Sequence, residues 1–89
     1  MSEAPEIRLR RLRMRSIRRG IKEMDVILSA YSEAHLAGLD AGALDRYEAL
    51  LSENDQDLYR WVSGQEEAPA DHAAIVGDIR AHIARSVDF

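Results

Sequence analysis

The 89-residue chain is long enough for one domain, and with 46% hydrophobic and 31% charged residues it has the composition of a folded protein rather than a disordered one. It contains no cysteine, which excludes a disulfide framework, a thiolate zinc site and a thiol nucleophile. No apolar run approaches the ~20 residues of a membrane span, and the first residues lack the apolar region of a secretory signal. We therefore expect a cytoplasmic protein that does not insert into a membrane.

The net charge of −4 hides an uneven distribution of charge along the chain. Residues 1–22 carry eight cationic side chains and two acidic ones, a net charge of +6, whereas the remaining residues carry four arginines and fourteen acids, a net charge of −10. We call residues 8–22 the basic arm. The sequence thus predicts a basic arm on an acidic body.

A flexible N-terminus, residues 1–6, is expected to precede a first short helix that ends between Ser16 and Gly20. Leu9 and Leu12 share one side of this helix, and it differs from the apolar face of the next segment. Glycine inside a helix costs about 1 kcal/mol relative to alanine. Gly20 is therefore predicted to be a junction between two helices of different direction.

The second helix is expected over residues 21–34, and Gly38 is a stop signal beyond it. Asp40 is placed to cap a third helix over residues 41–52. The apolar stripes predicted for these two helices are Ile17, Ile21, Met24, Leu28 and Tyr31 for the second, and Leu44, Tyr47, Leu50 and Leu51 for the third.

A fourth, shorter helix is predicted in "SENDQDLYRWVSG", with Asn54 or Asp55 as its cap and Gly64 at its end. After a loop containing Pro69, Asp71 is placed to cap the last helix. Its apolar positions recur every four residues, at Ile75, Ile79, Ile83 and Val87. Alternating β patterns are absent, so the chain is predicted to be a single all-α domain over residues 1–89, a small bundle of four or five helices.

The sequence contains no recognisable catalytic constellation or metal-ligand spacing. The histidines, His35, His72 and His82, are interpreted as surface or boundary residues, and the many acids as solvated faces and helix caps. A stand-alone enzyme is therefore disfavoured. Trp61 is predicted to be a core anchor of the fourth helix, with a place on a partner surface as the alternative.

The concentration of cations in the basic arm is the one feature that is not expected of an ordinary helical domain. On a helical path, six cations gather on one side, and a partner with negative charge would relieve their repulsion. Arg19 and Glu23 are four residues apart, which suggests a weak intrahelical ion pair. One alternative function is nucleic-acid binding through this patch, although the acidic body opposes a polyanion. The six cations are Arg8, Arg11, Arg15, Arg18, Arg19 and Lys22.

The segment Arg19-Gly20-Ile21-Lys22-Glu23 resembles the RGxxE signature of the small FAD assembly factors, the succinate dehydrogenase flavinylation factors of bacteria and mitochondria. The later segment "LLSENDQDLYRWVSG" is similar to the family's "LL…D.DL..W" segment. Order, spacing and length agree from about Ile7 to Ile83. Gln56 stands where many relatives carry proline, and glutamine is compatible with the start of a helix.

The resemblance implies a five-helix protein that is not itself an enzyme. Family members bind the flavoprotein subunit of succinate dehydrogenase, and in some bacteria that of fumarate reductase, and promote covalent attachment of FAD to a client histidine. It implies no tightly bound cofactor, because the FAD is held by the client. The partner-binding residues it implies are Arg19, Gly20 and Glu23, with Arg18 and Lys22 beside them.

Overall fold

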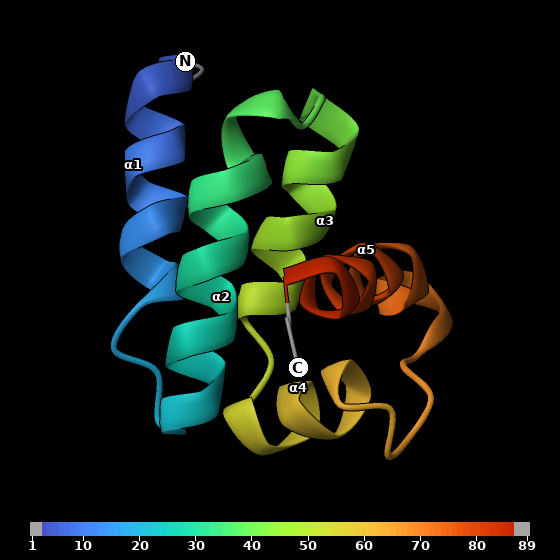
Figure 1. The fold of residues 1–89 in the computed structure, drawn as a ribbon. Helices are drawn as coiled ribbons and strands as arrows, with labels where there is room; N and C mark the ends of the chain where they lie inside the picture. The colour runs from blue at the N-terminus through green and yellow to red at the C-terminus, as the bar shows by residue number, and fades with distance from the viewer. Residues whose placement is uncertain (1–2, 87–89) are drawn as a thin grey trace.

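The computed structural model describes residues 3–86, and these form five α-helices joined by short loops (Figure 1). The all-α prediction is confirmed. No helix in this part of the chain has the length and apolar character needed to cross a membrane. The helices are α1 (Pro5–Ser16), α2 (Lys22–His35), α3 (Ala41–Leu51), α4 (Asp55–Val62) and α5 (Ala70–Ser86), with a short 3-10 turn, η1 (Leu36–Gly38), after α2.

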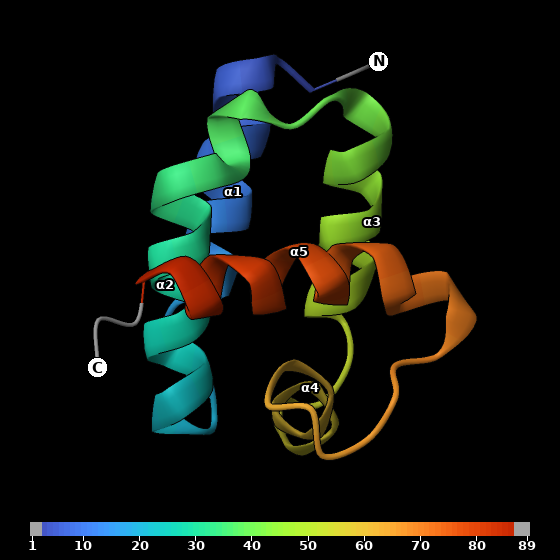
Figure 2. The same ribbon diagram turned by 45° about the vertical axis from the view of Figure 1, so that its right-hand side comes forward.

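The first three helices stand side by side, and α5 crosses α2 and α3. Figure 1 shows α1, α2 and α3 with their axes roughly parallel, and α1 packs against both α2 and α3. In Figure 2, α5 lies across α2 and α3, while α4 is seen end-on beside the lower ends of α2 and α3. Each helix thus buries one face against at least two others, which is how a chain of this size encloses a core.

Capping residues fix most of the helix ends where the sequence predicts them. The Asp40 carboxylate accepts a hydrogen bond from the Ala43 N–H (2.8 Å), and the Asn54 side chain accepts one from the Asp57 N–H (2.9 Å), so Asn54 rather than Asp55 caps α4. The prediction for Asp71 is wrong. Helix α5 already begins at Ala70, directly after the proline, and Asp71 lies in its first turn.

The start of α1 differs from the expectation, whereas the prediction of Gly20 as a junction between two helices is confirmed. Pro5 occupies the first turn of α1, where a proline has no hydrogen bond to lose, so residues 5 and 6 are already helical. The turn from α1 to α2 has its left-handed residue at Arg18 (φ +57°) and not at Gly20. Gly20 lies between the helices as predicted, but a left-handed backbone is not the reason for a glycine there.

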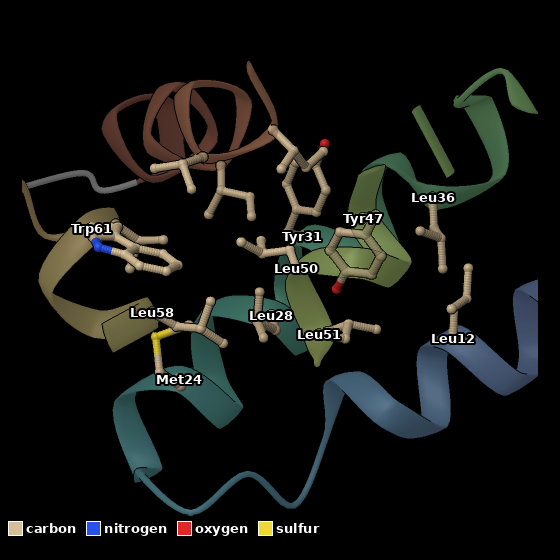
Figure 3. Packing of buried hydrophobic residues seen from close by; sticks show 14 residues of the cluster. Leu12, Met24, Leu28, Tyr31, Leu36, Tyr47, Leu50, Leu51, Leu58 and Trp61 are labelled. Atoms are coloured by element: carbon tan, nitrogen blue, oxygen red, sulfur yellow. The ribbon is translucent and has the colours of Figure 1, made fainter. Parts of the chain in front are cut away.

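A single apolar core lies where the five helices meet (Figure 3). Trp61 is 5% exposed, so its interpretation as a core anchor is confirmed. Of the predicted stripes, Ile21, Leu44 and Ile83 pack partly buried at the edge of this core, and Val87 lies outside the described residues. The buried core side chains are Leu12, Met24, Leu28, Tyr31, Leu36, Tyr47, Leu50, Leu51, Leu58, Trp61, Val62, Ile75, Val76 and Ile79.

One buried polar contact joins α1 to α3 within this core. The Ser16 hydroxyl donates to the Leu12 carbonyl oxygen (2.7 Å), so the Tyr47 hydroxyl is the donor in its 2.6 Å contact with the Ser16 oxygen. Burial raises the pKa of Tyr47 to about 12, which keeps this hydroxyl protonated at neutral pH. Ser16 is thus a core residue with its polar atom satisfied.

Candidate functional site

The RGxxE-like segment forms the turn between α1 and α2 and the first residues of α2. We call residues 17–21 the motif loop. It lies beside the N-terminal end of α4, although the two are more than thirty residues apart in sequence. The five residues assigned to partner binding from the sequence therefore sit together at one end of the molecule, but their side chains have different surroundings.

Arg19 points into the protein rather than out to a partner. Its side chain is 12% exposed, and its Nε lies 2.7 Å from Asp55 Oδ1, whose side chain is 17% exposed. The other guanidinium nitrogens donate to the carbonyl oxygens of Arg15 (2.9 Å), Leu51 (3.2 Å) and Glu53 (3.4 Å). With this set of acceptors, the guanidinium ties the motif loop to the α3–α4 turn.

Gly20 is in contact with the other oxygen of the same carboxylate. Its backbone N–H donates to Asp55 Oδ2 at 2.5 Å. A Cβ at position 20 would lie 3.0 Å from that oxygen, closer than a methyl group normally approaches a carboxylate. The close approach to this glycine is therefore made by Asp55 of this same chain. We call the contacts of Arg19 and Gly20 with this carboxylate the Asp55 clasp.

The remaining motif residues face solvent. Arg18, Lys22 and Glu23 are exposed, and none of them has an ion-pair partner among the described residues. The intrahelical pair of Arg19 and Glu23 predicted from their spacing does not form, because Arg19 precedes α2 and binds Asp55 instead. Of the motif, Lys22 and Glu23 are therefore the charged groups free to meet a partner.

An open groove of about 460 Å³ lies next to these two residues, between α2 and α4. Val26, Ile27 and Tyr59 form its apolar wall, and Lys22 and Glu23 complete the lining. Surface grooves with apolar walls and a few polar groups at the edge are typical places for a partner side chain to bind. The motif thus borders a preformed hollow, a feature that the sequence did not reveal.

Most arginines of the predicted basic patch form ion pairs with acids of this same chain. Arg8 lies 2.6 Å from Asp45 and 3.1 Å from Glu48, and Arg11 lies 2.9 Å from Glu48 and from Glu3. These arginines lower the pKa of Glu48, with the hydrogen bond from Arg11 as the largest cause. The patch predicted from a helical path is therefore wrong for this part of the arm, because α3 supplies its counter-charges. This removes the main support for nucleic-acid binding.

One histidine lies in the core, and the other two meet at the contact between α2 and α5. His72 is buried beside Trp61, with a ring-centroid distance of 5.6 Å, and its Nε2 lies 2.9 Å from Glu53. His35 on α2 and His82 on α5 approach within 3.0 Å through ring nitrogens. The described residues contain no group of three or more His, Cys, Asp or Glu arranged to hold a metal ion.

Asp55 belongs to the candidate site, and the sequence analysis does not place it there. The sequence predicts it only as an alternative cap for α4, although Asn54, Asp55 and Asp57 together offer more side-chain oxygens than one cap needs. These extra side-chain oxygens are the one feature of the sequence that indicates a further role for Asp55. Its true partner could not be deduced from spacing, since the clasp joins residues 35 and 36 positions apart.

We predict that Asp55→Asn lowers the free energy of unfolding by about 2–3 kcal/mol, because an amide cannot accept from both donors and leaves the largely buried Arg19 guanidinium without its counter-charge. Chemical denaturation measures this. The matched control is Asp57→Asn, two residues on, where the lost ion pair with Arg60 is more exposed. It should cost under about 1 kcal/mol. Equal effects of the two variants would contradict a structural role for the clasp.

The structure thus defines a small all-α domain with five α-helices in its described part and a loop anchored to the start of α4. Residues 10–83 match the protein-family model described as flavinator of succinate dehydrogenase. This match covers well over half of the chain and reaches from α1 into α5. The chain belongs to this family.

Several curated relatives share the name succinate dehydrogenase assembly factor 2, mitochondrial. The protein of Candida glabrata is 40% identical over 63 residues, covering 71% of this chain and 41% of the relative. That of Meyerozyma guilliermondii is 41% identical over 61 residues, covering 68% and 45%, and that of Schizosaccharomyces pombe is 37% identical over 67 residues, covering 75% and 48%. The chain spans less than half the length of these relatives.

The names of these relatives contradict the cytoplasmic location expected from the sequence, because each is named as a mitochondrial protein. That expectation rested on the lack of an apolar signal and on the lack of cysteine. Neither feature distinguishes the cytoplasm from the mitochondrion. The two observations are correct, but the location inferred from them is wrong.

Proposed function

We propose that this chain is an assembly factor that binds the flavoprotein subunit of succinate dehydrogenase and promotes covalent attachment of FAD to a histidine of that subunit. The observation that carries the proposal is the family match over residues 10–83, which includes the complete motif loop and the groove beside it. The exposed Lys22 and Glu23 at the groove support a role in protein binding.

The proposed mechanism assigns the chemistry to the client and the positioning to this chain. Joining a histidine nitrogen to the flavin methyl carbon would break a methyl C–H bond, with the proton leaving to a base and the two electrons staying on the flavin. It requires that the nitrogen and the carbon be held close and that the negative charge developing on the flavin be stabilised. A helper that binds one arrangement of the client's domains more tightly than the others raises the population of that arrangement. The FAD stays bound to the client, so the chain itself needs no tightly held cofactor.

The residues divide this work between a scaffold and a contact surface. The Asp55 clasp holds the motif loop in one conformation, so Arg19 and Gly20 serve the site by shaping it. Lys22 and Glu23 make the charged contacts with the client, and Arg18, exposed in the motif loop, adds a further cation near them. Preorganisation of this kind reduces the entropy lost on binding.

Deleting the gene tests the proposed function in the cell. The client flavoprotein should remain present but carry much less covalent flavin, which in-gel fluorescence of the denatured subunit reports without interference from dissociable FAD. Restoring the gene should restore the signal. Undiminished fluorescence in the deletion strain would contradict the proposal.

A further inference from the structure

The groove between α2 and α4 exposes an apolar side chain that the fold does not need there. Val26 is 61% exposed on α2 and forms part of the groove wall with Ile27 and Tyr59. Valine is a weaker helix former than alanine or leucine, and at this exposure it adds little to the core. The other exposed large apolar side chains of the described chain, Ile7 and Met14, lie on α1, away from this groove.

Two opposite charges border the same groove. Lys22 and Glu23 both line it, both are exposed, and neither has an ion-pair partner among residues 3–86. Adjacent unpaired charges of opposite sign complement a partner segment that carries an acid and a base close together. They disfavour a partner of one charge sign, such as a polyanion.

The groove is held open by the fold. Helix α2 begins directly after the motif loop, which the Asp55 clasp fixes against α4. A second groove of about 470 Å³ is lined by Gly20, Ile21 and residues at the start of α4. The two sides of the apolar groove, α2 and α4, are thus joined through the clasp, and the groove is present in the chain without a partner.

We infer that this groove receives an apolar side chain of the client flavoprotein, flanked in the client by an acidic group that faces Lys22 and a basic group that faces Glu23. The inference rests on the proposed function and names the contact through which it acts. In this arrangement, Val26, Ile27 and Tyr59 supply the buried contact area, while the two charges fix the orientation of the client segment.

A matched pair of variants tests the inference. Val26→Asp places a charge in the groove, whereas Ile7→Asp makes the same kind of change at a residue of similar exposure (55%) on α1. Binding to the purified flavoprotein subunit without covalent flavin is measured by isothermal titration calorimetry, and circular dichroism checks that both variants are folded. We expect Val26→Asp to weaken binding about tenfold or more, as for a residue in the buried centre of an interface, and Ile7→Asp to change it less than about twofold.

A charge reversal provides the second measurement. Glu23→Lys should weaken binding by a similar factor, because it opposes the client's basic group. If Val26→Asp and Glu23→Lys bind like the wild-type chain while that chain binds the client, the groove assignment is overturned and the proposed function stands. Equal losses for Val26→Asp and Ile7→Asp would also overturn it. If the wild-type chain does not bind the flavoprotein at all, the proposed function fails, and this inference fails with it.

Discussion

Replacing Ile79 with aspartate is expected to unfold the protein at room temperature. Ile79 is fully buried on α5, the helix that crosses the bundle and packs on α3 and α4. An ionised carboxylate there finds no counter-charge and costs several kcal/mol, on top of the lost apolar contacts. Because a small domain has only about 5–15 kcal/mol of total stability, this loss approaches the whole.

Circular dichroism during heating measures the effect. Ala74→Asp is a suitable control because it introduces the same charge at a residue that is exposed on the same helix. The control should melt close to the wild-type chain, and the Ile79→Asp variant should show no cooperative transition. A melting temperature within a few degrees of wild type would show that α5 does not pack in this way.

Gly20→Arg is expected to abolish client binding and also to lower stability. If Gly20 were only a junction between two helices, an arginine here would leave the bundle folded. The structure places Asp55 Oδ2 at 3.0 Å from the Cβ position, so a side chain here must push the carboxylate that holds Arg19 and the motif loop aside by a few tenths of an ångström. We expect a loss of about 2–4 kcal/mol, comparable to breaking a largely buried ion pair.

Gly20→Ala separates the two effects of that change. It adds only the Cβ, so it tests the clasp without placing a long side chain at the surface. It should lower stability by about 1 kcal/mol, and not raise it, because position 20 lies outside the helices and gains nothing from helix propensity. Thermal melting and client affinity are measured on the same samples. A Gly20→Arg variant that melts and binds like the wild-type chain would contradict the role of the clasp.

Local signals predicted most of the fold. The caps Asp40 and Asn54, the left-handed Gly64 (φ +83°) and the four-residue recurrence of isoleucine in α5 each depend on neighbours within one or two turns. Such interactions are encoded in short stretches of sequence, so the five helices and most of the core could be predicted. The error at Asp71 is local too, since several residues after Pro69 could begin α5.

The candidate site was less predictable because its decisive contacts are long-range. From the sequence, Arg19 is predicted to be a surface cation, but in the fold it binds Asp55. Likewise, Arg8 and Arg11 are predicted to form an exposed patch, but in the fold they pair with Glu48 of α3. The resemblance to the flavinylation factors located the motif but gave no information on which of its residues face outward. The packing of α4 against the motif loop is what distinguishes Arg19, which binds Asp55 inside the protein, from Glu23, which is exposed.

The most direct test of the proposed function is a reconstitution with purified components. The flavoprotein subunit without covalent flavin is incubated with FAD, with and without this chain, and the denatured subunit is then examined for flavin fluorescence over time. The proposed function predicts faster and more complete covalent attachment when the chain is present, and a Val26→Asp variant should give much less of this gain. Identical time courses with and without the wild-type chain would contradict it.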